Sequence, residues 1–125
     1  MMEFTIYGRL PSLNEYIKEC RSNKYSANKM KQEVEKCVYF AIRQAKLQKV
    51  TKYPVTLEIT WYEQNSRRDV DNIVFATKFI QDALVNAGII VNDGQKQISS
   101  LVHHVIIDKN NPRVEVKICM KDGKA

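Results

Sequence analysis

Residues 55–62 read VTLEITWY, and their apolar and polar side chains alternate. This period of two indicates a β-strand with one buried face and one more exposed face. Pro54 precedes the strand, and we expect residues 63–68 to form a polar turn after it. The strand gives the point from which the rest of the chain can be assigned.

A helix is expected before this strand. Apolar residues recur there every three or four positions and form one stripe: Met30, Val34, Cys37, Val38, Ala41, Ile42 and Ala45. Ser26 or Asn28 would cap the N-terminus. The opposite face is mostly basic, and we expect Cys37 to lie in the core.

A second helix, roughly Val70 to Ala87, is expected after the polar turn. It runs into Gly88, which can adopt the left-handed cap conformation and let Ile89 fold back on the last turn. Phe75 and Phe79 flank its polar face. Apolar side chains at such positions suggest a subunit contact or a further layer of packing.

Three further strands complete the expected fold. Residues 4–7 form a short strand, and residues 100–107 and 113–120 look like two strands joined by a hairpin loop. The order strand, helix, strand, helix, strand, strand predicts an α+β fold. We expect one domain over residues 1–125, a small two-layer sandwich of a mixed sheet with two helices.

The composition limits the class of protein. The chain of 125 residues carries 20 Lys and Arg against 14 Asp and Glu, a net charge of +6, and a distributed positive charge favours a polyanion as partner. No apolar run is long enough to cross a bilayer and no cleavable leader is visible, so we expect a cytoplasmic protein without a membrane partner. Three scattered cysteines do not suit a disulfide framework. No phosphate-binding glycine loop is present, so no nucleotide cofactor is expected.

The strongest candidate for chemistry is SRRDVDN at residues 66–72. Its two carboxylates, Asp69 and Asp71, follow a pair of arginines where the strand gives way to the helix. Magnesium prefers oxygen ligands and usually takes only one or two from a protein. Asp93 lies in an expected tight turn at 92–94, and if that segment folds back along the helix, three acids could face one ion. Such a site can activate water and neutralise phosphate charge.

Lys78 follows Asp71 by seven residues, which on a continuous helix brings it to within about 20° of the same direction. Lys78 could therefore stabilise the negative charge of a transition state. The alternative is structural. Asp69 or Asp71 would cap the helix, and Lys78 would form an ordinary surface pair with Asp82.

Taken in order, four segments resemble the RusA family of Holliday junction resolvases: RDVDNI at 68–73, Lys78, DAL at 82–84 and NDGQ at 92–95. The family consists of homodimeric, magnesium-dependent endodeoxyribonucleases that cut four-way DNA junctions. LPSLN at 10–14 is similar to its N-terminal Pro-x-Ser-x-Asn segment, and the resemblance extends to residues 111–116. It implies a RusA-like fold, a homodimer, Mg²⁺ that Mn²⁺ can replace, branched DNA as substrate, and a role in DNA recombination and repair.

Residue by residue, the resemblance assigns Asp69, Asp71 and Asp93 to the metal-binding catalytic acids and Lys78 to the catalytic lysine. Two departures are visible. The interval from Asp71 to Lys78 is one helical turn, about 5 Å along the axis, longer than in the best-known member. The turn often written with two acids is here Asn92-Asp93.

Several basic residues could line a DNA path by contacting phosphates: Arg67, Arg68, Lys29, Lys31, Lys36 and Arg43. His103 and His104 are adjacent in an expected strand, so they point to opposite faces, and neither is expected to be catalytic. A non-catalytic nucleic-acid-binding protein remains the alternative. A calcium-stabilised structural domain is disfavoured, because Asp69-x-Asp71 lacks the other oxygen ligands of a calcium loop.

Overall fold

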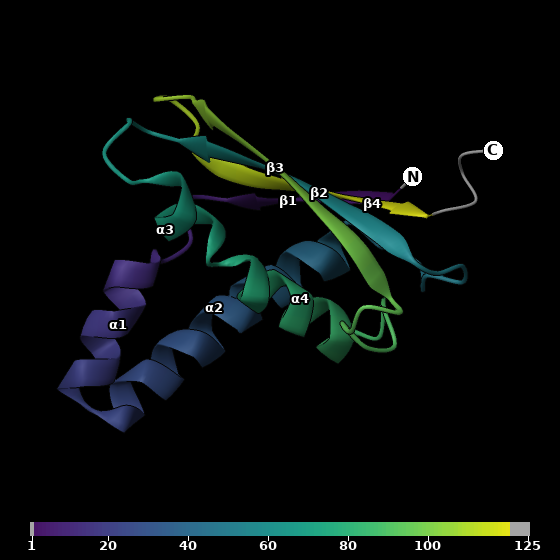
Figure 1. The fold of residues 1–125 in the computed structure, drawn as a ribbon, viewed down its shortest axis with the longest axis horizontal. Coiled ribbons are helices and arrows are strands. Elements are labelled where there is room, and N and C mark those ends of the chain that lie inside the picture. The colour runs from purple at the N-terminus through teal and green to yellow at the C-terminus, as the bar shows by residue number, and fades with distance from the viewer. Residues whose placement is uncertain (1, 121–125) are drawn as a thin grey trace.

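The described part of the chain forms one mixed sheet. In the computed structural model, which describes residues 2–120, the strands are β1 (Met2–Tyr7), β2 (Val55–Glu63), β3 (Ile98–Ile107) and β4 (Arg113–Met120). Their order across the sheet is β1-β4-β2-β3. β4 is antiparallel to β1 and β2, whereas β2 and β3 are parallel (Figure 1). The predicted α+β class with a mixed sheet is confirmed.

The predicted hairpin between β3 and β4 is wrong, because β2 lies between these two strands. Residues 108–112 do reverse the chain, but they carry it past the end of β2, where the Asp108 N–H donates a 2.8 Å hydrogen bond to the Glu63 carbonyl. The turn composition predicted the reversal and could not predict the neighbour. β4 has an inner place because its alternate side chains, Val114, Val116 and Ile118, are buried, whereas most of β3 is exposed.

Helices pack on one face of the sheet and make the second layer (Figure 1). They are α1 (Leu13–Ser22), α2 (Lys24–Gln44), α3 (Val70–Val74) and α4 (Thr77–Asn86). The predicted alternation of strands and helical regions holds. The expectation of two helices is corrected to four: the first predicted helix is α2, the second is divided into α3 and α4, and α1 is an additional helix that was not predicted.

α1, which was not predicted, begins inside the LPSLN segment at residues 10–14. Ser12 caps it, because its hydroxyl accepts a hydrogen bond from the Glu15 N–H (3.2 Å) while the Glu15 carboxylate accepts one from the Ser12 N–H (2.8 Å). This capping box is legible in the sequence as Ser-x-x-Glu. None of the residues of α1 is fully buried, but Leu13, Tyr16, Ile17 and Cys20 recur at helical spacing, so the sequence does carry a signal for this helix that our prediction did not use.

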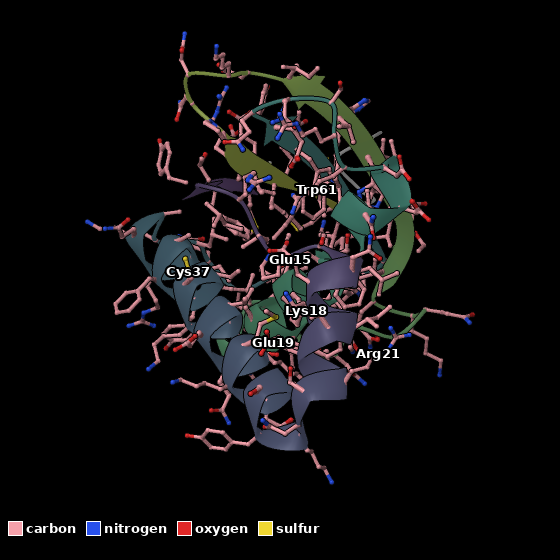
Figure 2. The ribbon with its side chains drawn as sticks, turned by 90° about the vertical axis from the view of Figure 1, so that its left-hand side faces the viewer. Glu15, Lys18, Glu19, Arg21, Cys37 and Trp61 are labelled. Atoms are coloured by element: carbon pink, nitrogen blue, oxygen red, sulfur yellow. The ribbon has the colours of Figure 1, made fainter. Side chains whose placement is uncertain are left out.

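α2 begins earlier than predicted, and its cap is Asn23, whose side chain accepts a 2.7 Å hydrogen bond from the Ser26 N–H. The predicted stripe is largely correct, since Val34, Val38 and Ile42 are buried. Cys37 is the exception and a correction, because it is exposed on the surface of α2 (Figure 2). Its angular position on the helix lies just outside the buried stripe.

The predicted helix from Val70 to Ala87 is interrupted at residues 75–76, between α3 and α4. Phe79 is 2% exposed, and the ring of Phe75 packs 5.6 Å from it and 5.4 Å from the ring of Tyr16 on α1. The unpredicted helix α1 therefore covers both phenylalanines. Of the two alternatives that we predicted for these side chains, a further layer of packing is confirmed, and a subunit contact through them is not.

The end of α4 is as predicted. Gly88 has a φ of +75°, and the Ile89 N–H donates a 3.0 Å hydrogen bond back to the Leu84 carbonyl. Ile89 is buried. The tight turn that follows lies slightly later than predicted, with the Gln97 N–H donating to the Gly94 carbonyl at 3.0 Å. Among residues 2–120, no helix is long and apolar enough to cross a membrane.

Candidate active site on the crossover between β2 and β3

All four candidate catalytic residues lie on the crossover that joins β2 to β3, residues 64–97. Asp69 and Asp71 stand at the start of α3, Lys78 stands in the first turn of α4, and Asp93 precedes the turn into β3. The parallel pairing of β2 and β3 requires such a long connection, because the chain must return along the whole sheet.

Arg68 anchors the beginning of the crossover. Its guanidinium makes a two-pronged contact with the Glu63 carboxylate, Nε to Oε1 at 3.0 Å and Nη2 to Oε2 at 2.8 Å. Nη1 donates to the Leu10 carbonyl at 3.0 Å and reaches Oε1 of Glu15 at 3.4 Å. Arg68 thus ties the end of β2 to the start of α1 and fixes the backbone next to Asp69.

Glu15 belongs to the same cluster. Partial burial would raise its pKa, but hydrogen bonds from Ser12 and the positive charge of Arg68 outweigh that effect and lower the pKa below its ordinary value. Glu15 therefore stays ionised beside the arginine at neutral pH.

Asp69 and Asp71 are exposed, and neither side chain has a hydrogen bond or ion pair with another described residue. Asp69 occupies the N-cap position of α3 without making the side-chain cap hydrogen bond. The capping role that the structural alternative assigned to Asp69 is therefore absent. Asp71 lies in the first turn of the same helix. Both carboxylates are available to a ligand.

Lys78 lies between two carboxylates. Its Nζ is 3.1 Å from Oδ1 of Asp82, one turn further along α4, and 3.6 Å from Oδ2 of Asp93. The hydrogen bond with Asp82 raises the pKa of Lys78, and the negative charge of Asp93 raises it further. Partial burial acts in the opposite direction but does not cancel the rise. Lys78 is therefore a firmly charged cation, and the surface pair of the structural alternative is present.

A polar hollow surrounds this lysine, and one of its residues, Glu35, was not named from the sequence. Lys31 and Glu35 of α2 line it together with Lys78, Asp82, Asn92 and Asp93. Oε2 of Glu35 is buried without a hydrogen-bond partner. Burial, and next the negative charge of Asp82, raise the pKa of Glu35. The signal in the sequence was the i, i+4 spacing of Lys31 and Glu35 on the helix face that meets α4.

The three aspartates are not gathered at one point in this structure. Asp93 is held by Lys78, while Asp69 and Asp71 stand apart from that pair at the start of α3. Among residues 2–120, no three Asp, Glu, His or Cys side chains are grouped closely enough to hold a metal ion. The interruption at residues 75–76 also means that Asp71 and Lys78 do not share one continuous helix.

The predicted phosphate-contacting residues fall into three groups. Lys29, Lys36 and Arg43 are exposed on α2 at seven-residue intervals, which places them along one side of the helix. Lys31 points elsewhere, with its Nζ 4.0 Å from Asp82. Arg67 is exposed, whereas Arg68 is engaged within the protein.

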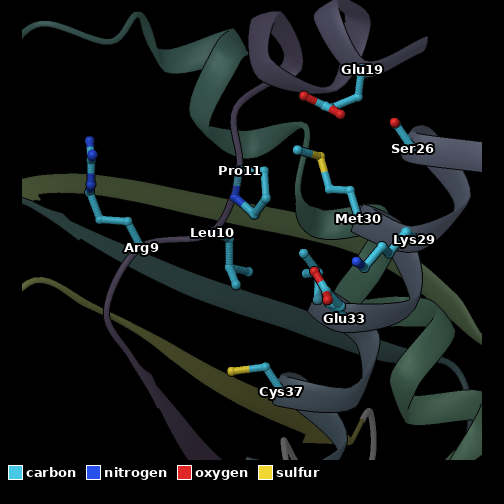
Figure 3. Close-up of a pocket in the computed structure, with 10 residues that line it drawn as sticks. Arg9, Leu10, Pro11, Glu19, Ser26, Lys29, Met30, Glu33 and Cys37 are labelled. Carbon is cyan, nitrogen blue, oxygen red and sulfur yellow. The ribbon is translucent and has the colours of Figure 1, made fainter. Parts of the chain in front are cut away.

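Lys29 also lines a surface groove between residues 9–11 and α2 (Figure 3). Arg9 stands at one side of this groove, and Glu19 and Glu33 contribute acids. Its charges are mixed, so we assign the groove no role in binding DNA.

Both histidines have partners within the sheet. The Trp61 Nε1–H donates to Nδ1 of His103 at 3.0 Å, and His104 Nε2 lies 2.9 Å from Oε2 of Glu58. Burial, and then the neighbouring His104, lower the pKa of His103. His103 is therefore neutral at physiological pH.

These features define a class of protein, an α+β domain in which a parallel pair of strands is joined by a crossover that carries free carboxylates. A family model described as endodeoxyribonuclease RusA matches residues 9–119. The chain therefore belongs to the RusA family, and the resemblance seen in the sequence is confirmed. Family membership implies the activity of a Holliday junction resolvase endonuclease. A comparison with curated proteins found no match.

Proposed function

We propose that this protein is a magnesium-dependent endodeoxyribonuclease that resolves four-way DNA junctions by paired strand incision in recombination and repair. The observation that carries the proposal is the pair of unengaged carboxylates, Asp69 and Asp71, on a backbone that the Arg68–Glu63 contact fixes. These two acids are one residue apart in the chain, and both are exposed without a protein partner, so they are free to bind a divalent cation.

The donor set fits magnesium, with manganese as a substitute. Magnesium is usually held by one or two carboxylates, water and substrate phosphate, and Asp69 and Asp71 supply such a pair. Asp93 is the third ligand by family assignment, and Lys78 neutralises it here. When bound, the ion would supply the charge that activates water for in-line attack on phosphorus.

Lys78 has the role of charge stabiliser. Its ammonium is 61% exposed at the side chain and keeps its proton because of Asp82 and Asp93. An exposed ammonium group that Asp82 and Asp93 hold in place can contact a phosphate oxygen as negative charge develops there. Asp82 then positions the lysine and does not act on substrate.

The net charge of +6 and the exposed side of α2 support binding of the DNA backbone. Lys29, Lys36, Arg43 and Arg67 would contact phosphates, with Lys31 at the rim of the polar hollow. Phosphate contacts give affinity without reading base sequence, which suits recognition of a junction by its shape. Arg68 takes part only by holding the loop in place. A homodimer acting in the cytoplasm would cut two strands of one junction.

The experiment is cleavage of a synthetic four-way junction with magnesium by the native protein, Asp71→Asn and Glu3→Gln. Glu3 is an exposed acid on β1, far along the sheet from the crossover. We expect Asp71→Asn to bind the junction and leave it uncut, whereas Glu3→Gln cuts normally. Binding without cleavage by all three proteins would instead establish the non-catalytic alternative.

A further inference from the structure

The outward side of α2 carries aromatic rings among positive charges. α2 packs against α1, α4 and β1, with Val34 and Val38 on its buried side. Tyr25 and Arg43 lie about five turns apart on the helix, so they share one line along the opposite side. Three exposed aromatic residues and three exposed cations lie within about 60° of this line, namely Tyr25, Tyr39 and Phe40 with Lys29, Lys36 and Arg43. We call this surface the aromatic-basic face.

Two rings on the aromatic-basic face are open to solvent. The side chains of Tyr25 and Phe40 are 75% and 63% exposed. Tyr39 is less open, and its ring already has a partner, because the guanidinium carbon of Arg43 lies 5.9 Å from the ring centroid. Apolar side chains that are grouped on a surface and surrounded by polar residues mark an interaction site. Tyr25 and Phe40 are therefore available to a ligand.

The charges limit what this ligand can be. Among the described residues of α2, none within about 60° of the line from Tyr25 to Arg43 is acidic. The whole chain carries a net charge of +6, so a second copy would be repelled from this face, whereas an anionic polymer would be attracted. Contacts with phosphates need only the cations. The exposed rings call for a ligand that also presents flat apolar surfaces.

An unpaired DNA strand presents both groups. Its phosphates can contact cations, and its bases can stack on aromatic rings because no second strand covers them. In a duplex the bases are already stacked on one another, and the side of the duplex offers mainly its backbone. Lys36, Phe40 and Arg43 follow one another at the spacing of neighbours on a helix surface, so one open ring lies between two cations.

We propose that the aromatic-basic face of α2 binds an unpaired DNA strand. Bases stack on the rings of Tyr25 and Phe40, while Lys29, Lys36 and Arg43 contact the phosphates on either side. The inference goes beyond the proposed function, on which it rests only for the choice of DNA as the polymer. It gives this protein a surface that distinguishes an unpaired strand from a duplex.

The test is fluorescence anisotropy with a labelled oligothymidylate of about 12 nucleotides and with a duplex of the same length, both without magnesium. We expect Phe40→Ala to bind the single strand at least about five-fold more weakly, the smallest effect of losing one stacked base, and to bind the duplex as the native protein does. Phe40→Leu should lose as much, because it keeps an apolar side chain but no flat ring. Tyr7→Ala, which removes a 73% exposed ring on β1, should bind both DNAs normally.

The salt dependence of binding separates the rings from the cations. Lys36→Ala should make the plot of log affinity against log salt concentration less steep by about 0.7 for the single strand, the value for one lost phosphate contact. Phe40→Ala should lower the affinity and leave that slope unchanged, because stacking releases no counterions. A slope that changes in Phe40→Ala and not in Lys36→Ala contradicts the assigned roles.

Four results would overturn the inference. They are no binding of the oligothymidylate by the native protein, no loss in Phe40→Ala, equal losses for the two DNAs, and a smaller mass of Phe40→Ala than of the native protein by light scattering. The last result would assign the face to a contact between copies of this chain. Junction cleavage is not part of the test. A protein that binds single strands through Phe40 and cuts no junction would contradict only the proposed function.

Discussion

Two ionic clusters hold the crossover, and they differ in burial. Around Arg68 the side chain is 15% exposed and its partner Glu63 is 5% exposed, whereas the side chain of Lys78 is 61% exposed. A buried bidentate arginine has one geometry and no alternative partners. A solvated lysine shared by two carboxylates can exchange them for a phosphate at little cost. The comparison separates a residue that places the site from one that can act in it.

Replacing Arg68 should give the largest effect. Arg68→Ala leaves the Glu63 carboxylate buried without its partner, and breaking a buried pair in this way costs about 3 kcal/mol or more. We expect the free energy of unfolding in urea to fall by that amount. Arg68→Lys should recover only part of it, since an ammonium cannot make both contacts.

Arg67→Ala is the matched control, because Arg67 is the exposed neighbour. It should change the free energy of unfolding by no more than about 0.5 kcal/mol. Equal losses for the two alanine variants would show that the contact with Glu63 does not anchor the loop.

Replacing Lys78 should have the opposite pattern to replacing Arg68: a small effect on the free energy of unfolding and a large effect on junction cleavage. In Lys78→Ala the lost contacts are surface ion pairs, so the free energy of unfolding should change by less than about 1 kcal/mol. Junction cleavage should fall about 100-fold, the usual effect of removing one group that stabilises transition-state charge. Single-turnover cleavage rates and urea unfolding of the same preparation measure the two quantities.

Lys109→Ala, in the exposed loop between β3 and β4, controls for the loss of one positive charge. It should cut at the native rate. If it slows cleavage as much as Lys78→Ala does, the effect of Lys78 is one of net charge.

The smallest effect should come from Glu35, which lies beside the Lys78 cluster. Because burial and Asp82 raise its pKa in the folded state, the folded protein binds this proton more tightly than the unfolded chain does. Ionised Glu35 therefore destabilises the fold at neutral pH, and that penalty disappears as the pH falls below the ordinary carboxyl range. Glu35→Gln should be more stable than the native protein at pH 7, with the difference shrinking toward pH 4.

Thermal melts across that pH range measure the effect, and Glu33→Gln, an exposed acid on the same helix, is the control. A difference that grows toward acid would show that Glu35 is stabilised as a carboxylate by Lys31 and Lys78.

The sequence predicted the positions of β2 and α2, whose apolar residues recur regularly. It did not predict the features that depend on contacts between distant segments, namely the helix interruption and the strand order. The alternation of residues 55–62 and the stripe on α2 each report burial by one face, so β2 and α2 were legible. α1 has no fully buried residue, and the interruption of the predicted helix falls where Phe75 packs against Tyr16 of α1. The contact between Tyr16 and Phe75 could not be predicted, because α1 itself was not predicted. The place of β4 between β1 and β2 likewise depends on which strand has the more apolar face.

The candidate site shows the same limit. The acids and Lys78 could be named from their order in the chain, and their place on the crossover followed from the strand and helix assignments. The partners could not be named. Glu63 and Leu10 hold Arg68 from positions that precede it by five and fifty-eight residues, and Glu35 reaches the lysine from another helix. Such contacts have no local pattern in the sequence.

The parallel pairing of β2 with β3 limits how this chain can vary in length. Antiparallel neighbours can be joined by a turn of two residues, but parallel neighbours need a connection of a dozen or more. Deletions in relatives should therefore accumulate in residues 46–54, whereas residues 108–112 must still pass the end of β2 and residues 64–97 must still join two parallel strands. The candidate catalytic side chains therefore lie on a connection whose minimum length is set by the parallel pairing of β2 and β3.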